Sequence, residues 1–373
     1  MDTNGLCELF SKKKNCSFVA VYGSVLQINC VNAAMSMLSR QGVKLDGYIF
    51  RISNKTIAQN TYDSNYANNS ESIEYIDGIE SFEYSKSRER FDVFKLAFSG
   101  KKNEDVLYFI SSDLIHPIYY SLMKTYGEYK RIVYVEVDDG LESYAPRYKN
   151  RLLMYKIKHQ RQNTMGLSNF TREVMRVFSI QFLIQLMRMK KNYLDERLLK
   201  LGGEIKKNED IAPFFCDVLS KNYAVSCGNM QFDLNDKILI VGDWATPIEL
   251  TAKCIDDLMD LGYEVVYKPH PRELNNDRLL MIKCEIMNMR NTALEVLLID
   301  KTNKPKCLIG EYSSVLMYSD LYFGVKPICC KSIEEFCGDN LDRKYAKMFK
   351  KIFNKTIYFP QNEDDLINYL SEL

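Results

Sequence analysis

The stretch that decides the fold reads Lys237-Ile-Leu-Ile-Val-Gly-Asp-Trp-Ala-Thr-Pro-Ile-Glu249. Its aliphatic run is typical of a buried β-strand, which a Gly-Asp turn then ends. Thr246, Pro247 and Glu249 together predict a helix start, with a capping hydroxyl, a proline in the first helical position and an acid that completes a capping box. We therefore predict a strand that leads directly into an α-helix.

The same strand-then-helix pattern recurs through the second half of the chain. Gly262 is expected to stop the first helix. The further expected elements are strands over 264–268, 306–309 and 326–330, a helix over 313–322 that Gly324 stops, and a final helix over 362–373. This alternation predicts a mostly parallel, Rossmann-like sheet.

The first half of the chain repeats the pattern less regularly. Strands are expected over 17–22, 47–51, 93–98, 106–110 and 131–137, and helices over 25–40 and 115–124. The stretch 54–83 is rich in Asn, Ser and acidic residues, and we interpret it as an inserted loop or short helices. The first half is therefore predicted to be a second α/β unit.

Length and the position of the helix-breaking glycines indicate two domains. At 373 residues the chain is longer than a single hydrophobic core usually grows. The pair Gly202-Gly203 interrupts a helical region, and we expect domains over 1–205 and 206–373. The last helix is a candidate for packing back on the first domain. The predicted fold class is α/β, with two Rossmann-like domains facing each other across a cleft.

The composition is that of an ordinary globular protein, with 46% hydrophobic and 27% charged residues. The start, Met1 to Asn15, has no apolar run for a signal-peptide core, and the apolar stretch 177–189 is too short to span a bilayer. The 11 cysteines have no Cys-x-x-Cys spacing, so we interpret them as reduced core residues. These features predict a cytoplasmic protein, at most peripheral at the inner face of a membrane, without a zinc site.

Basic residues are concentrated in one region. Between Arg147 and Lys200 there are 13 Lys and Arg residues against three acidic ones, although the net charge of the chain is +1. Such a run is typical of a solvated helical face, and it equally suits a surface for an anionic glycan acceptor or membrane lipid. The run contains no recognised nucleic-acid-binding motif, so no nucleic-acid partner is expected.

Three short motifs follow predicted strands, where open parallel sheets bind their ligands. The first is Asp138-Asp139-Gly140. One of its carboxylates could act as a general base toward a hydroxyl group. A plain Asp-Gly turn and, with Glu136 nearby, a metal-binding acidic pair are the alternatives.

The second motif is Lys268-Pro269-His270-Pro271-Arg272. The two prolines stiffen the backbone around the histidine, and the flanking cations favour an anionic ligand. His270 could donate a proton to a leaving phosphate. His116-Pro117 is the rival His-Pro pair, and a purely structural histidine is the other alternative.

The third motif is Gly310-Glu311-Tyr312-Ser313-Ser314, between a predicted strand and a predicted helix. Two hydroxyls and the N–H groups of a helix N-terminus could bind a phosphate. A serine that merely caps the helix is the alternative.

Together the motifs resemble those of the bacterial sialyltransferases that sialylate lipooligosaccharide and of the related capsule polysialyltransferases. That superfamily shares a D/E-D/E-Gly motif, a His-Pro motif and a Ser/Thr-rich motif. The matches here, in the same order, are Asp138-Asp139-Gly140, His270-Pro271 and Ser313-Ser314. The segment Val25-Leu-Gln-Ile-Asn29 also resembles the family's opening loop and helix, whereas 54–83 and 147–200 have no recognisable match.

The resemblance implies the GT-B glycosyltransferase architecture and an inverting, metal-independent transfer of sialic acid from CMP-sialic acid to lipooligosaccharide or capsular polysaccharide, without a further cofactor. By similarity, Asp139 would be the base, His270 would assist departure of CMP, and Ser313 and Ser314 would hold its phosphate. The remaining candidates for contact with the nucleotide are Gly242, Asp243, Thr246, Lys268, Pro271 and Glu295. Glu295 is equally consistent with a charge on a surface helix.

Other functions remain open from the sequence. The donor could instead be CMP-Kdo or CDP-glycerol on the same architecture. A metal-dependent enzyme of the GT-A fold would use the Asp138-Asp139 pair but leave the His-Pro and Ser-Ser motifs without roles. A glycan-binding or assembly protein on a decayed transferase fold is the non-enzymatic alternative.

Overall fold

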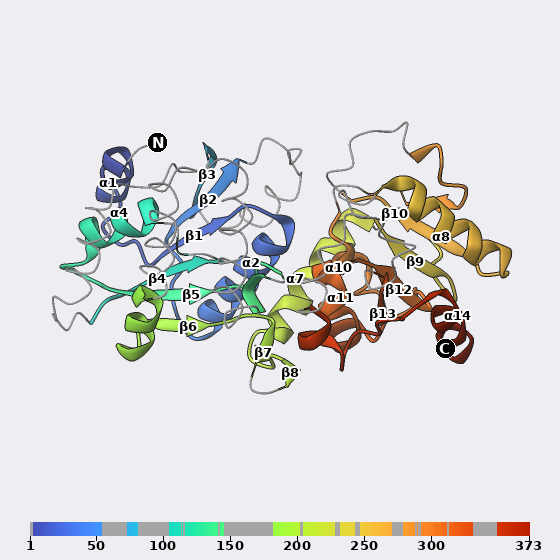
Figure 1. Ribbon diagram of the computed structural model, residues 1–373. Coiled ribbons are helices and arrows are strands. Elements are labelled where there is room, and N and C mark those ends of the chain that lie inside the picture. The colour runs from blue at the N-terminus through green and yellow to red at the C-terminus, as the bar shows by residue number, and fades with distance from the viewer. Residues whose placement is uncertain are drawn as a thin grey trace, which may run out of the picture. The chain divides into compact units, whose positions relative to one another are not determined.

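A computed structural model shows two compact units, one ending at Leu198 and the other running from Leu199 to Leu373 (Figure 1). The sequence placed the domain boundary a few residues further on, after residue 205. The structure describes residues 3–53, 73–80, 104–112, 114, 116–140, 142–144, 182–201, 204–227, 232–242, 247–270, 279–287, 289, 292–311, 313–330 and 349–373.

Unit 1 is built on a six-stranded sheet with the order β3-β2-β1-β4-β5-β6. Its strands are β1 (Phe18–Tyr22), β2 (Gly47–Ser53), β3 (Ile73–Glu80), β4 (Val106–Ser111), β5 (Arg131–Glu136) and β6 (Tyr193–Asp195). Every neighbouring pair is parallel. The strand order reverses between β1 and β4, as in a Rossmann fold, and ligands of such sheets bind at this switch point.

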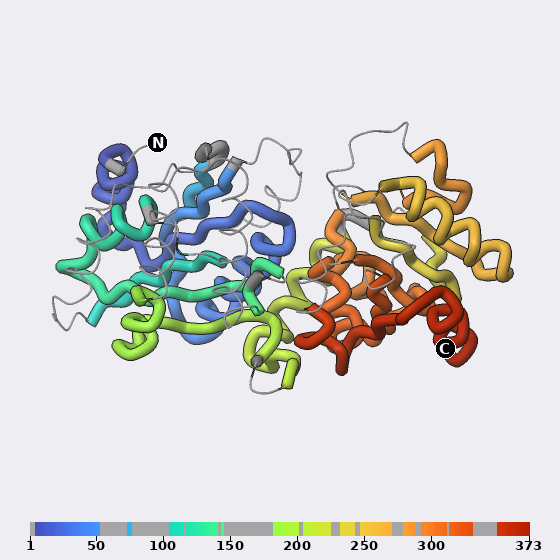
Figure 2. Tube along the Cα trace, in the orientation of Figure 1, coloured from blue at the N-terminus to red at the C-terminus, as the bar shows by residue number. Residues whose placement is uncertain are grey.

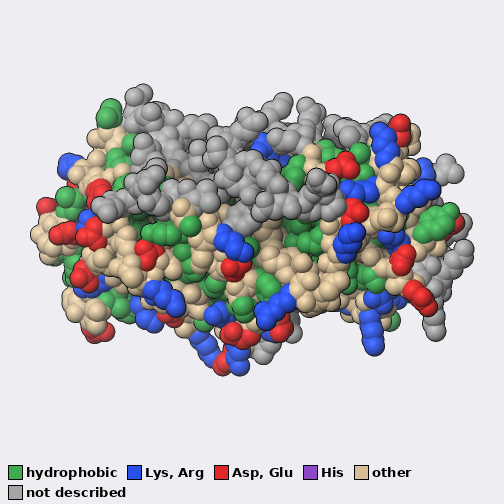
Figure 3. All heavy atoms as spheres, turned by 180° about the vertical axis from the view of Figure 1, so that it is seen from behind, with side chains coloured by type: hydrophobic (Ala, Val, Ile, Leu, Met, Phe, Trp, Pro, Cys, Tyr) green, Lys and Arg blue, Asp and Glu red, His purple; other side chains and the backbone are tan. Residues whose placement is uncertain are grey.

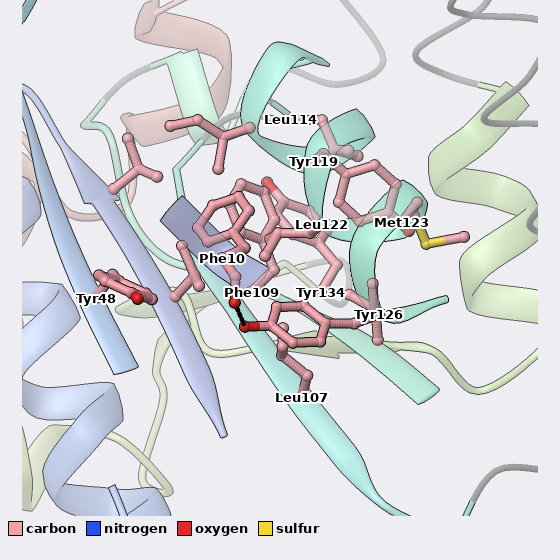
Figure 4. Packing of buried hydrophobic residues seen from close by; sticks show 14 of the residues in the cluster. Phe10, Tyr48, Leu107, Phe109, Leu114, Tyr119, Leu122, Met123, Tyr126 and Tyr134 are labelled. Atoms are coloured by element: carbon pink, nitrogen blue, oxygen red, sulfur yellow. Dashed lines mark hydrogen bonds between the residues drawn. The ribbon is translucent and has the colours of Figure 1, made fainter. Parts of the chain in front are cut away.

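Helices cover both faces of this sheet because alternate strand residues point to opposite sides. Helices α1 (Thr3–Ser11) and α4 (His116–Tyr126) pack on the face that carries Val19, Val21 and Phe109. Figure 4 shows this core, in which the Tyr126 hydroxyl donates a 2.6 Å hydrogen bond to the carbonyl oxygen of Phe10. Helix α2 (Val25–Arg40), which the sequence predicted, contacts β1 and β4.

Two predictions for unit 1 are wrong. The basic region 147–200 was expected to be helical, but its residues 193–195 form strand β6 and pair with β5. Residues 73–80, read as part of an inserted loop, form strand β3 and pair with β2. Acidic residues interrupt the apolar alternation of this strand, and a strand paired along one side can carry them. The predicted strand over 93–98 lies outside the described residues.

Unit 2 is built on a five-stranded parallel sheet with the order β11-β10-β9-β12-β13. Its strands are β9 (Ile238–Val241), β10 (Val265–Lys268), β11 (Glu285–Ile286), β12 (Cys307–Gly310) and β13 (Lys326–Cys329). The described part of the unit begins with an antiparallel hairpin of β7 (Leu199–Leu201) and β8 (Ile205–Lys207), followed by helix α7 (Ala212–Cys227). The strand order again reverses in the middle, between β9 and β12.

The last helix belongs to the core of unit 2. Helices α8 (Ile248–Asp260) and α14 (Glu363–Glu372) pack against the same face of the sheet, where α14 buries Leu366 and Leu370 among the side chains of β9, β10 and β12 (Figure 2). The sequence had left open that this helix packs on the first domain, and Leu366 and Leu370 place one face of it in the core of unit 2.

The start of α8 differs from its prediction by one residue. Pro247 is the N-cap and not the first helical residue, and the cap has no side-chain hydrogen bond. Thr246, the predicted cap, lies outside the described residues. The predicted helix stops are confirmed, because Gly262, just after the C-cap of α8, and Gly324, the C-cap of η3, adopt φ angles of +87° and +67°.

Within the part of the chain that the structure describes, no helix has the length and apolarity to cross a bilayer. The cysteines whose side chains the structure describes, nine in number, are all free thiols.

Candidate active site

Asp138 and Asp139 lie at the carboxyl edge of the unit 1 sheet, directly after β5. The loop from β1 into α2 ends at the same edge, because β1, β4 and β5 are parallel neighbours. Gly140 has a φ of +73°, a left-handed conformation that favours glycine, and it turns the chain into the 3-10 helix η2 (Glu142–Tyr144). The Asp-Asp-Gly motif is therefore a sharp turn at a ligand-binding edge.

The Asp138 carboxylate is buried and holds this turn in place. Its Oδ1 accepts a 2.8 Å hydrogen bond from the backbone N–H of Gly140. Its Oδ2 accepts hydrogen bonds from the Tyr144 hydroxyl and, at 3.3 Å, from the backbone N–H of Leu198. The Asp138 side chain is fully buried and accepts three hydrogen bonds, so its role is structural.

Asp139, in contrast, is exposed. Its backbone N–H donates a 2.8 Å hydrogen bond to Ser143 Oγ, and its Oδ1 accepts a hydrogen bond from Gln27 Nε2. Gln27 lies in the first turn of α2, which Ser24 caps. The sequence predicted Asp139 but assigned Gln27 no role, although Gln27 lies in the segment 25–29 that resembles the family's opening loop and helix.

Arg197 fixes the far side of the same turn. Its Nε donates a 2.7 Å hydrogen bond to Asp195 Oδ1, and its Nη2 binds the second carboxylate oxygen in a bidentate pair. Its Nη1 donates to the carbonyl oxygen of Ser143, and its guanidinium lies 5.9 Å from the centre of the Tyr144 ring. Arg197 thus ties β6 to η2.

Arg188, like Arg197 a member of the predicted basic region, also has a structural partner. The Arg188 guanidinium stacks 4.7 Å from the centre of the Tyr193 ring and donates a 3.1 Å hydrogen bond to its hydroxyl. That hydroxyl donates to the buried Glu136 carboxylate. Lys190 and Lys191 are exposed, whereas residues 145–181 of the region lie outside the described part. On the face shown in Figure 3, basic and acidic side chains are interspersed.

Gly242 and the His-Pro motif meet at the carboxyl edge of the unit 2 sheet. Gly242 follows β9, and its backbone N–H donates a 2.9 Å hydrogen bond to the carbonyl oxygen of Lys268 at the end of β10. A β-carbon on Gly242 would lie 3.1 Å from the backbone nitrogen of His270 and would collide with the Tyr267 hydroxyl. The half-buried His270 therefore depends on glycine at residue 242.

Lys268 and Glu295 are both buried, and the charge of each affects the pKa of the other. Their side chains are 3% and 6% exposed, so the alternative of a surface charge for Glu295 is wrong. Burial lowers the pKa of Lys268 to about 8, an effect that the charge of Glu295 partly offsets. Burial raises the pKa of Glu295, and Lys268 counteracts this. Glu295 lies on the four-residue helix α10 (Leu294–Leu297).

Ser313 and Ser314 follow β12 at the same edge. Ser313 is the N-cap of α11 (Ser314–Tyr318), which continues into the π-helix η3 (Ser319–Phe323). The Ser313 side chain makes no capping hydrogen bond, so its hydroxyl does not serve the helix. Both serines are half-buried, which leaves part of each accessible to a ligand.

The predicted site residues thus fall into two groups, one per unit. Asp138 and Asp139 belong to unit 1. In unit 2, Gly242, Lys268, His270, Ser313 and Ser314 follow the adjacent strands β9, β10 and β12, and Glu295 joins them through Lys268. Asp243, Thr246 and Pro271 lie outside the described residues. Among those described, no group of three or more His, Cys, Asp or Glu residues could hold a metal ion.

A family model for alpha-2,8-polysialyltransferase (POLYST) matches residues 51–332, more than half of the chain. Among solved structures, the 2,6-sialyltransferase of Photobacterium sp. JT-ISH-224 is 14% identical over 92% of this chain and 78% of that chain, with a TM-score of 0.46. The UDP-GlcNAc 2-epimerase of Methanocaldococcus jannaschii is 13% identical over 95% of this chain and 92% of that chain, with a TM-score of 0.48. No curated protein matches the sequence.

Proposed function

The chain belongs to the alpha-2,8-polysialyltransferase family, and on that basis we propose that it transfers sialic acid from CMP-sialic acid to a glycan acceptor, with inversion and without a metal ion. One observation carries this proposal. The family match over 51–332 encloses the Asp-Asp-Gly turn of unit 1 and both the His-Pro and Ser-Ser motifs of unit 2. The chain is thus a glycosyltransferase whose family-matched region contains every predicted catalytic residue.

Asp139 is the proposed general base. Its exposure allows contact with an acceptor hydroxyl, whereas the buried Asp138 keeps the turn in shape. As the acceptor oxygen forms its bond to the anomeric carbon, the hydroxyl proton moves to the Asp139 carboxylate. The bond from that carbon to the phosphate oxygen of CMP breaks in the same step, so the configuration inverts.

His270 is the proposed general acid. It would give its proton to the departing phosphate, and Ser313 and Ser314 would donate hydrogen bonds to the other phosphate oxygens. The freedom of the Ser313 hydroxyl from a capping role supports this assignment. The buried Lys268 adds positive charge near the same strand end, and Gly242 allows the His270 backbone to approach the end of β9 closely.

The alternative mechanism for the same glycosyl transfer is metal-dependent, with a metal ion bound by the Asp138-Asp139 pair. The hydrogen bonds from Tyr144, Gly140 and Leu198 to Asp138 weigh against that role, because they occupy both of its carboxylate oxygens. We expect turnover to survive EDTA. Loss of activity on chelation that Mn²⁺ or Mg²⁺ restores would favour the metal-dependent reading.

The acceptor is proposed to be an anionic glycan or glycolipid, such as lipooligosaccharide or capsular polysaccharide, bound with help from the basic region 147–200. The exposed Lys190 and Lys191 are the described residues that support this. Contact of the basic region with an anionic membrane surface would bring the protein close to glycolipid acceptors.

Product analysis tests the proposed function. The protein is incubated with CMP-sialic acid, CMP-Kdo or CDP-glycerol and a panel of saccharide acceptors, and the products are identified by mass spectrometry and by the configuration of the new linkage. A new inverted sialyl linkage from CMP-sialic acid alone is expected. Transfer from one of the other donors would replace the sialyl assignment, and no transfer from any donor would favour a glycan-binding protein.

A further inference from the structure

We propose that Gln27 is a positioning residue whose amide, held in place by the backbone, keeps the Asp139 carboxylate ionised. The inference rests on the proposed function, because it concerns the same base. Gln27 bridges two elements at the carboxyl edge of the unit 1 sheet: its Oε1 accepts a 2.5 Å hydrogen bond from the backbone N–H of Gly23, and its Nε2 donates to Asp139 Oδ1.

The two partners fix which end of the amide faces Asp139. A backbone N–H can only donate, so the carbonyl oxygen of Gln27 must face Gly23. The NH₂ group then faces Asp139 Oδ1, which accepts its hydrogen bond. A side chain with one acceptor and one donor at its tip is required here, and glutamine has that arrangement at the right length.

The surrounding backbone holds the glutamine in this orientation. Ser24 caps α2 by accepting a 3.2 Å hydrogen bond from the backbone N–H of Gln27. Gly23 is the last residue before this cap, at the end of β1. Asp139 is fixed from its own side by the bond from its N–H to Ser143 Oγ. The amide and the carboxylate are therefore both anchored at the backbone.

A donor at Oδ1 stabilises the ionised carboxylate over the protonated form. Removal of the donor should therefore raise the pH at which Asp139 becomes an active base. A carboxylate in place of the amide should raise it further, since two acids at hydrogen-bond distance share one proton until the pH is higher. The other titratable groups on the described elements near this edge are Tyr22 of β1, Cys30 of α2, Glu136 of β5, Asp138 and Tyr144 of the turn, Asp195 of β6, and Arg197 after β6.

The test is the pH dependence of kcat and kcat/KM in the full-length protein with Gln27→Leu and Gln27→Glu. For Gln27→Leu we expect the acid limb of both profiles to move up by about one pH unit, as the loss of one charge-assisted hydrogen bond allows. A larger shift is expected for Gln27→Glu. Both variants should regain most of the wild-type rate at high pH, and KM for the nucleotide donor should stay the same.

Gln41 provides the matched control. It is an exposed C-cap at the opposite end of the same helix, so Gln41→Leu and Gln41→Glu should leave the acid limb unchanged. An equal loss of rate at all pH values in the Gln27 variants, or no loss at all, would overturn the inference. The proposed function fails separately, if Asp139→Asn retains the wild-type rate.

Discussion

Gly242 and His270 lie against each other at the ends of the neighbouring strands β9 and β10. A β-carbon on Gly242 would come 3.1 Å from the His270 backbone nitrogen and closer still to the Tyr267 hydroxyl. Because Tyr267 is fully buried and strand β10 is paired on both sides, neither neighbour can give way easily. The position of His270, the proposed acid, therefore depends on the absence of a side chain at Gly242.

Gly242→Ala should displace the His-Pro loop and destabilise the protein by about 1–3 kcal/mol, the usual range for overpacking. Urea unfolding measures the stability, and calorimetry with CMP measures the accompanying loss of nucleotide affinity. Gly310→Ala is the matched control at the end of β12, since its β-carbon would meet Val241 Cβ at an ordinary 3.5 Å. Equal effects of the two substitutions would contradict the coupling.

The buried Lys268 should make stability depend on pH in the alkaline range. Burial lowers its pKa to about 8 from 10.5, so between these values the unfolded chain binds more protons than the folded one. This group therefore stabilises the fold increasingly as the pH rises through that window. Relative to Lys268→Met, the wild type should gain roughly 3 kcal/mol across it.

Chemical unfolding at a series of pH values between 7 and 10.5 measures this difference. Comparison with Lys268→Met removes the shared contribution of the buried tyrosines and cysteines, which titrate in the same range. Lys253→Met, which changes an exposed lysine on α8, should show the same pH dependence as the wild type. Parallel curves for the wild type and Lys268→Met would show that Lys268 is not strongly desolvated.

Much of this fold could be predicted from local patterns. Strands such as β9 and β12 are paired on both sides, so they read as continuous aliphatic runs, and turn residues mark their ends. The three proposed ligand motifs follow such strands, and their positions at the sheet edges follow from that alone. The first residues of a helix are less certain, as Pro247 shows, because an N-cap and the first helical position differ by one residue.

The rest depends on contacts between distant residues. The bond between Gln27 and Asp139 joins residues 112 positions apart, and no local pattern indicates it. From the local sequence, Glu295 is indistinguishable from a charge on a helix surface. Its burial, like that of Lys268, depends on the tertiary fold. Strand β3 is recognisable only once β2 is there to pair with it.

CMP should raise the melting temperature, because a ligand that binds only the folded state stabilises it by mass action. The shift should shrink in Ser313→Ala/Ser314→Ala, since loss of hydroxyl bonds to a charged phosphate weakens binding by about tenfold or more. Ser319→Ala is the control, because that hydroxyl is buried and donates to the Leu316 carbonyl. Stronger stabilisation by UMP or ADP than by CMP would contradict the proposed donor.

The basic region should contribute to the binding of anionic acceptors but not of neutral ones. Charge reversal at Lys190 and Lys191, with Lys156, Lys158 and Arg161 from the part outside the described residues, should raise KM for an anionic or membrane-borne acceptor and weaken its salt dependence. A small neutral acceptor should be used as before. Arg188 is left unchanged because it packs on Tyr193.

Reversal of the exposed pair Lys350 and Lys351 in unit 2 serves as the control for total charge. If the variant of the basic region uses both acceptor types as well as the wild type does, the region is a solvated face without a role in binding.

The central claim assigns the two proton transfers to different residues, Asp139 and His270. A change of the leaving group distinguishes their roles. Asp139→Asn keeps the shape of the side chain but removes the proton acceptor, so turnover should fall by about 10²–10⁴ while CMP binding is retained. His270→Ala should also lower turnover, but through the departure of the phosphate. His116→Ala, at the rival His-Pro pair, is the control.

The most direct measurement compares the turnover of these three variants with CMP-sialic acid and with a sialyl donor whose leaving group departs without protonation. We expect the second donor to restore most of the loss in His270→Ala and none of the loss in Asp139→Asn, with His116→Ala near the wild-type rate on both. A near-normal rate for Asp139→Asn, or a greater loss in His116→Ala than in His270→Ala, would contradict the account.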